Sequence, residues 1–212
     1  MPQGLRRLSR QQYENALDSF ARQAVSERDA RNAVRGLPLD RLPPDVLSKD
    51  EDYPTLVNAV GQGHVDAYYE ASFALGQALA PMLAEGCADV ACAEPTLANL
   101  ALHAFRRPPE PAEVAFLRDD VFASAATPED GFRNAVTVLT SSPDFLYRLE
   151  QGEGEPDDRG ARRLTPYELA SRLSFHFWQA PPDQTLLDAA ASGAILTEDG
   201  YVPAGELEVG DT

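Results

Sequence analysis

The sequence has few of the residues from which metal, haem and thiol sites are built. Its 212 residues include two cysteines, three histidines and one tryptophan. Cys87 and Cys92 are too widely spaced for a Cys-x-x-Cys pair, and no further cysteine is present to complete a zinc site. The sequence also lacks a Cys-x-x-Cys-His run, which excludes covalent attachment of a c-type haem to this chain. We therefore expect no metal site and no bound cofactor.

The two cysteines leave three interpretations open. Cys87 and Cys92 can form a local disulfide that closes a short loop after a helix, remain two free thiols, or act as a metal or redox pair. We favour the local disulfide. If it forms, the protein works in an oxidising compartment.

Long apolar runs are absent as well. No uninterrupted apolar stretch reaches the length of about 18 residues that a membrane-spanning helix needs. The first residues, MPQGLRRLSR, are basic but lead into no apolar segment, so no secretion signal is visible. We predict no transmembrane segment.

Positive charge is scarce outside the N-terminal part. The formal net charge is −16, although residues 1–41 carry eight arginines against five acidic residues. An acidic protein of this kind is a poor partner for nucleic acid. The charge suits a basic protein partner, or simply a well-solvated surface.

No segment alternates apolar and polar residues over enough positions to indicate a strand, so the predicted fold is all-α. We expect an array of short helices with proline-rich connectors. One helix starts at Ser9, and another is expected to start after Tyr53-Pro54 and to end at Gly61. Further helices are predicted over residues 64–83, 95–106, 111–124, 128–140, from 143, over 166–180, and after Asp183.

The domain organisation follows from the polar segment 151–161, which we interpret as a linker. It separates an N-terminal helical module, residues 1–150, from a second helical domain that begins over residues 162–196. Residues 197–212 are expected to form an irregular tail, in which Asp199-Gly200 indicates a small hairpin. The sequence ends without a closing element, and we interpret it as truncated.

The stretch from Arg162 to Leu187 has the clearest helical signal. Thr165 can cap the helix, Pro166 suits the first helical position, and Glu168 can complete a capping box. Apolar residues then recur at four-residue spacing, which predicts a broad buried face. The predicted core residues of this helix are Leu169, Leu173, Phe177 and Trp178.

Several arginines are candidate anion-binding groups: Arg106, Arg107, Arg148 and Arg172. The alternative is structural ion pairing, of Arg172 with Glu168 four residues earlier and of Arg148 with Glu150 or another helix. His176 lies in an aromatic run, where it is either a histidine at the edge of the core or a haem or metal ligand.

Catalytic motifs are missing. The three histidines form no His-Glu-x-x-His pattern, and neither a Ser-His-Asp arrangement nor a glycine-rich phosphate loop is supported by the sequence. We expect no catalytic residue, and the sequence leaves open whether the protein is an enzyme.

Three runs of sequence together resemble a known group of bacterial domains. They are LRRLSRQQYENAL with HVDAYYEASFALGQAL, then AFRRPPEPAEVAFL with NAVTVLTSSPDFLYRLE, and finally LTPYELASRLSFHFWQAPPDQTLLDAAASGAI. These runs resemble the planctomycete cytochrome-associated domains of unknown function 1587, 1595 and 1592, in that order. The resemblance covers residues 4–196, and the absence of the later domains of such proteins agrees with a C-terminal truncation.

The resemblance implies a compartment and a neighbour rather than an activity. Such domains imply a periplasmic, cell-surface or secreted protein that works beside c-type cytochrome modules, and this setting favours the disulfide between Cys87 and Cys92. The first functional hypothesis is therefore an interaction or scaffolding module that binds a c-type cytochrome or another envelope protein. The alternative is a non-catalytic fragment of an extracellular enzyme whose active site needs a further C-terminal region.

Overall fold

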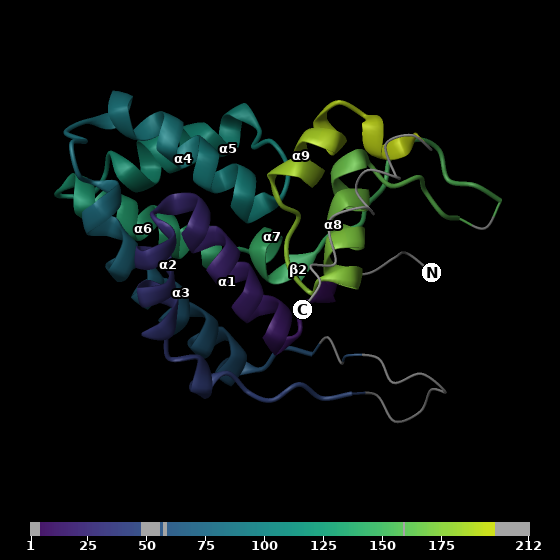
Figure 1. Ribbon diagram of the computed structural model, residues 1–212, viewed down its shortest axis with the longest axis horizontal. Helices are drawn as coiled ribbons and strands as arrows, with labels where there is room; N and C mark the ends of the chain where they lie inside the picture. Colours follow the sequence, from purple (N-terminus) through teal and green to yellow (C-terminus); the bar gives the residue numbers. More distant parts are fainter. Residues whose placement is uncertain (1–4, 48–55, 57–58, 159, 198–212) are drawn as a thin grey trace, which may run out of the picture.

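The computed structural model describes residues 5–47, 56, 59–158 and 160–197, and this part of the chain is almost entirely helical (Figure 1). Its one sheet is a short antiparallel pair that joins Arg6 to Arg148 and Arg7 to Tyr147. The predicted all-α fold is confirmed. The elements are β1 (Arg6–Arg7), α1 (Arg10–Ala24), α2 (Glu27–Arg35), the 3-10 helix η1 (Leu39–Arg41), α3 (Gln62–Leu83), α4 (Val90–Phe105), α5 (Pro111–Ala115), the π-helix η2 (Phe116–Phe122), α6 (Pro128–Ser141), α7 (Pro143–Leu146), β2 (Tyr147–Arg148), α8 (Pro166–Phe177), α9 (Gln184–Ala191) and the 3-10 helix η3 (Ala194–Leu196).

Helices begin where side chains can accept the free backbone N–H groups of the first turn. In α8, the Thr165 hydroxyl accepts from the N–H of Glu168, whose carboxylate accepts from the N–H of Thr165. Pro166 occupies the first helical position. The helix starts predicted at Ser9, Thr165 and Asp183 are confirmed, and each of these residues caps its helix.

Other boundaries differ from those predicted. Helix α2, capped by Ser26, was not predicted from the sequence, and its nine residues bury only two alanines. Helix α4 starts at Val90 rather than near residue 95, because Asp89 caps it. The helix expected over residues 111–124 changes to a π-helix at Phe116. The helix expected after Tyr53-Pro54 lies mostly outside the described residues, and the hairpin expected at Asp199-Gly200 lies wholly outside them. Gly61, where that helix was expected to end, is instead the N-cap residue of α3.

The larger core joins α1, α3, α4, α6 and α7. Aromatic rings meet edge to face within it, where the ring centre of Phe145 lies 5.9 Å from that of Phe20 and 6.2 Å from that of Tyr13. Helices α3 and α6 approach closely at Gly76, where an added Cβ would lie 2.6 Å from the carbonyl oxygen of Arg133. A larger residue at position 76 would therefore force these two helices apart.

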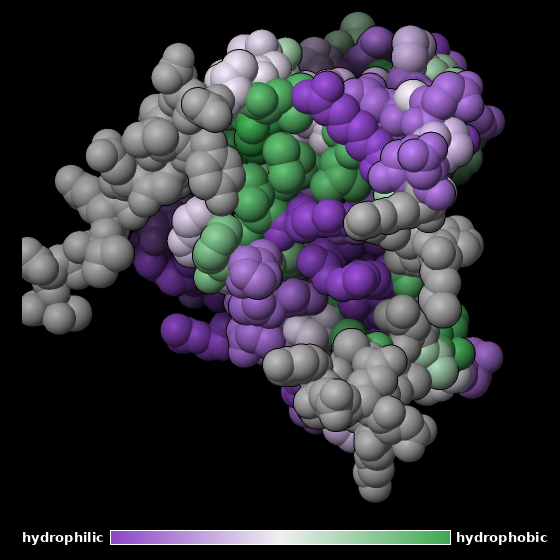
Figure 2. Space-filling view, turned by 90° about the vertical axis from the view of Figure 1, so that its right-hand side faces the viewer, coloured by the Kyte–Doolittle hydropathy of each residue, from purple (hydrophilic) through white to green (hydrophobic). Residues whose placement is uncertain are grey.

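Helices α8 and α9 pack beside this body (Figure 1), and they share a smaller core with η3. Figure 2 shows the face that carries them, where hydrophobic residues gather next to strongly hydrophilic ones. The two cores are not independent, because Phe175 of α8 belongs to the larger one. The division of the chain at residues 151–161 stays a prediction.

Candidate functional site

A cleft of about 540 Å³ lies where α8 meets the larger body. Its walls come from the end of α4 and the residues after it, from α7 and β2, and from the start of α8. The lining includes three arginines, three carboxylates and several hydroxyl groups: Phe105, Arg106, Arg107, Pro108, Glu110, Asp144, Arg148, Leu149, Gln151, Gly152, Thr165, Tyr167, Glu168 and Ser171. Three of the four arginines singled out from the sequence meet there.

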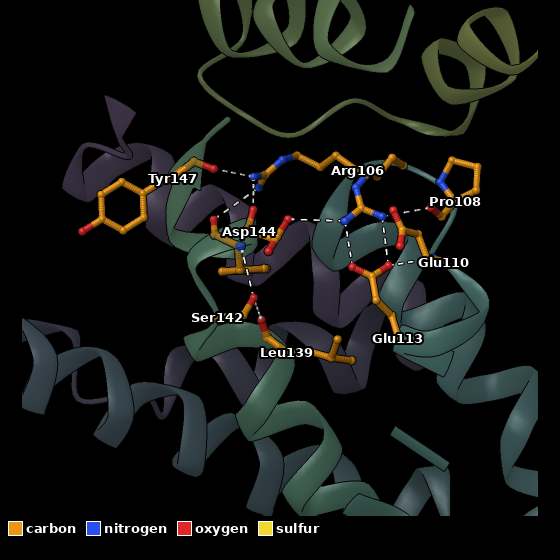
Figure 3. A network of polar contacts seen from close by, with 10 residues as sticks. Arg106, Pro108, Glu110, Glu113, Leu139, Ser142, Asp144 and Tyr147 are labelled. Atoms are coloured by element: carbon orange, nitrogen blue, oxygen red, sulfur yellow. Dashed lines mark hydrogen bonds and ion pairs between the residues drawn. The ribbon is translucent and has the colours of Figure 1, made fainter. Parts of the chain in front are cut away.

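Arg106 is the buried anchor of the cleft, with 4% of its surface exposed. It ends α4 in the left-handed backbone region, at φ 58°. Its guanidinium donates to the carbonyl oxygens of Phe145 at 3.2 Å, of Tyr147 at 2.7 Å and of Asp144 (Figure 3). Burial lowers the pKa of Arg106 to about 10, so the group remains charged at neutral pH. This cation ties the end of α4 to α7 and β2.

Arg107 is neutralised by two neighbouring carboxylates. Its guanidinium donates two hydrogen bonds to the carboxylate of Glu113, at 2.9 and 2.8 Å (Figure 3). The Asp144 carboxylate lies 3.6 Å away, and the ring of Phe105 lies 5.3 Å from the guanidinium carbon. The hydrogen bonds from Arg107 lower the pKa of Glu113. Arg107 therefore brings no unmatched charge to the cleft.

Phe175 joins α8 to the body, and its ring lies close to two guanidinium groups. The carbon atom of the Arg106 guanidinium lies 5.5 Å from the ring centre, and that of Arg148 lies 5.8 Å from it. The side chain is fully buried. Each interaction of a cation with the face of an aromatic ring stabilises a folded protein by about 0.5–2 kcal/mol. These contacts join side chains from three separate segments of the chain.

Glu150 and Glu168 make the second attachment of α8. Both carboxylate oxygens of Glu150 accept hydrogen bonds from Arg172, and Glu168 accepts from the backbone N–H groups of Gln151 and Gly152. Burial acts to raise the pKa of Glu150, but the hydrogen bonds from Arg172 and the positive charges of Arg172, Arg148 and Arg6 together lower it below its ordinary value. The predicted pairing of Arg172 with Glu168 is wrong, because Glu168 is engaged by backbone N–H groups and Arg172 reaches Glu150 instead.

Arg148 makes no salt bridge with the described residues, although the charge of Glu150 acts on it. Its Nε atom is buried and has no hydrogen-bond partner among the described residues. Burial lowers the pKa of Arg148, Glu150 raises it, and the positive charges of Arg6 and Arg172 lower it further. No hydrogen bond or salt bridge joins Arg148 to Glu150, whose two oxygens accept from Arg172, and the two groups interact only through their charges.

The predicted core of α8 is only partly correct. Leu169 and Leu173 are half-buried against the smaller core. Phe177 and Trp178 are 60% and 49% exposed, so their assignment to the core is wrong. His176 is exposed as well, and not at the edge of the core. The fully buried residues are instead Ala170, Ser174 and Phe175.

The aromatic and cysteine motifs lie outside the cleft. The ring centres of Phe177 and Trp178 lie 5.7 Å apart in an edge-to-face arrangement at the end of α8. The sulfur atoms of Cys87 and Cys92 lie at disulfide-bonding distance, with Cα atoms 5.6 Å apart, as the favoured interpretation requires. Cys92 lies in the first turn of α4, so this bond would fasten the start of α4 to the end of the preceding loop.

Two classes of feature are absent from the described part of the chain. No three residues of the kinds that bind metals, namely His, Cys, Asp and Glu, cluster there as a candidate metal site. None of its helices is both long enough and apolar enough to cross a membrane.

The sequence did not identify Arg106 as a structural anchor or Phe175 as the residue that joins α8 to the body. Arg106 follows the last helical residue of α4, a position often taken by a left-handed glycine, and no sequence signal marks the carbonyl groups that it reaches. Phe175 belongs to an apolar run that covers more than one side of α8. The four-residue spacing from Leu169 therefore selected the wrong face.

Comparison with known proteins gives two partial matches. No curated protein and no solved structure matches the chain. The family matches cover residues 92–150 and 164–203, so the cleft takes its walls from both regions. The chain is thus similar over residues 92–150 to the family PSD5, described as a protein of unknown function (DUF1595), and over residues 164–203 to the family PSD4, described as a protein of unknown function (DUF1592).

Proposed function

We propose that the chain is an interaction module of a bacterial envelope or secreted protein, and that it binds a positively charged partner such as a c-type cytochrome. The observation that carries this proposal is the exposed pair Phe177 and Trp178. Large aromatic side chains dominate the binding energy of many protein interfaces. Two adjacent ones on the surface are a natural anchor for a partner.

The backbone beneath this pair is held in place. Phe175 is buried in the larger core, and Gln179 accepts from the side chain of Gln12 and, through its carbonyl oxygen, from Asn15, both at 2.9 Å. Helix α8 therefore presents Phe177 and Trp178 from a rigid base. A rigid base lowers the conformational entropy lost on binding.

Charge argues for the nature of the partner. A protein with a net charge of −16 attracts basic proteins over distances of about the Debye length and accelerates their association. The resemblance to cytochrome-associated domains makes a c-type cytochrome the partner of choice within this class. The cytochrome association and the envelope location are part of this proposal.

The second candidate function, a contribution to an extracellular enzyme, is favoured only by the cleft. None of the three histidines lines it, and Glu168 and Asp144 are engaged by backbone groups and by Arg107. A group placed for proton transfer would have to come from elsewhere. The cleft is better suited to binding than to chemistry.

The test measures binding to a purified c-type cytochrome of positive net charge by biolayer interferometry. We expect the double variant Phe177→Ala/Trp178→Ala to bind at least about tenfold more weakly, since each tenfold corresponds to about 1.4 kcal/mol. The matched control is Phe116→Ala, which removes a 48% exposed aromatic ring from another surface. Equal binding by wild type and double variant, or an equal loss in the control, contradicts the proposal.

Salt provides the second readout. Raising the ionic strength from about 0.01 M to about 0.15 M shortens the Debye length from about 30 Å to about 8 Å, so association should slow markedly. An acidic c-type cytochrome should bind much more weakly than a basic one under both conditions. Tighter binding of the acidic protein would show that the surface charge does not select the partner.

A further inference from the structure

We propose that the cleft between α8 and the larger body binds a small hydroxylated carboxylic acid, such as a hexuronic acid, whose carboxylate pairs with Arg148. This site is separate from the exposed aromatic pair, because neither Phe177 nor Trp178 lines the cleft. The inference rests on the balance of charges among the groups that line the cleft.

The other strong charges there already have partners. Arg106 donates to three carbonyl oxygens, and Arg107 is held by Glu113 and Asp144. Glu168 accepts from three backbone N–H groups, two of them from the segment after β2. None of these groups needs a ligand to complete its contacts.

Arg148 differs from them in this respect. Its guanidinium lies over the ring of Phe175, its Nε atom is buried without a partner among the described residues, and its cationic neighbours Arg6 and Arg172 repel it. Glu150, the anion whose charge acts on Arg148, is already hydrogen-bonded to Arg172. A partly desolvated cation without a direct partner is costly, and a carboxylate is the geometric match to the planar guanidinium. An incoming carboxylate would pair with Arg148 directly.

The remaining lining groups indicate what else the ligand carries. The hydroxyl of Ser171 forms no hydrogen bond with the described residues, and that of Thr165 uses only its acceptor side, so both can donate. Glu110 and Asp144 offer carboxylate oxygens that accept from hydroxyl groups. Tyr167 provides an aromatic wall. These groups suit a hydroxylated ring, and a volume of about 540 Å³ accommodates one such molecule.

The experiment titrates the whole chain with D-glucuronate by isothermal titration calorimetry, with D-glucose as the neutral analogue and inorganic phosphate as the comparison anion. We expect saturable binding of glucuronate, and at least about tenfold weaker binding of glucose and phosphate. Phosphate binding as tight as that of glucuronate would contradict a carboxylate site, and equal binding of glucose would contradict any role for Arg148.

The variant Arg148→Gln removes the proposed contact and should weaken glucuronate binding at least about tenfold. Arg148→Lys keeps the charge but loses the planar fork, so we expect a smaller loss. The matched control Arg31→Gln removes one positive charge from the 53% exposed side chain on α2 and should bind as the wild type does. If Arg148→Gln is misfolded by circular dichroism, Ser171→Ala provides the independent test, with an expected loss of several-fold. Unchanged binding in every folded cleft variant overturns the proposal.

Discussion

Replacement of Arg106 by Met tests whether this buried cation holds the body of the protein together. The change removes the donor to three backbone carbonyl groups, those of Asp144, Phe145 and Tyr147. Each acceptor left unsatisfied inside a protein costs about 1–3 kcal/mol, whereas removal of the guanidinium recovers its own desolvation cost. We expect a net loss of about 3–5 kcal/mol, the range observed when one partner of a buried charged network is removed. Folded domains are stable by only about 5–15 kcal/mol in total.

The measurement is urea denaturation followed by far-UV circular dichroism, with the free energy of unfolding obtained by linear extrapolation. Arg107→Met is the matched control, because it removes a neighbouring arginine whose side chain is 34% exposed and which pairs with the carboxylates of Glu113 and Asp144. Such a pair contributes about 1 kcal/mol or less. A loss below about 1 kcal/mol in Arg106→Met, or a larger loss in the control, would refute the role assigned to Arg106.

Three further predictions follow from the same contacts. Phe175→Ala should lower the free energy of unfolding by about 3–5 kcal/mol, because it leaves a cavity at a fully buried site. A loss as small as that of an exposed residue, measured by urea denaturation, would contradict the place of Phe175 in the core. The pKa of Glu150 is lowered in the folded state, so the ionised carboxylate stabilises the fold. This contribution to the free energy of unfolding is complete above the ordinary pKa of 4.5 and is lost as the pH falls through the folded pKa. Thermal melts between about pH 7 and pH 3 should therefore show a smaller acid-induced loss in Glu150→Gln than in wild type, and equal slopes would argue against the pair with Arg172. Intact-mass analysis of protein from an oxidising compartment should show a mass lower by two hydrogens than after reduction. Loss of the Cys87–Cys92 bond should lower the free energy of unfolding by about 2 kcal/mol. Two freely alkylated thiols would contradict the bond.

The sequence predicts helix starts well because a cap is a local interaction. Thr165, Pro166 and Glu168 lie within four consecutive positions, and their roles need no knowledge of the rest of the fold. The same holds for Asp183, which caps α9. In contrast, the change to a π-helix at Phe116 depends on how the segment packs against its neighbours, and its sequence carries no signal for it.

The contacts of the cleft were not predictable for a related reason. Arg172 has a carboxylate four residues earlier in Glu168, yet it pairs with Glu150, which lies 22 residues away in sequence. The carboxylate of Glu168 instead accepts hydrogen bonds from the backbone N–H groups that follow β2. Phe175 was missed because an apolar run can face either of two cores, and only the position of the larger body decides between them.

The most direct test of the account asks whether α8 and the larger body unfold together. Trp178 is the only tryptophan, and it follows the last residue of α8, whereas far-UV circular dichroism reports on all helices. If Phe175, Glu150 and Arg172 join the two parts as described, the urea transitions measured by tryptophan fluorescence and by circular dichroism should coincide. A separate, earlier fluorescence transition would show that α8 unfolds independently, and the cleft between the two parts would then not be a permanent feature of the protein.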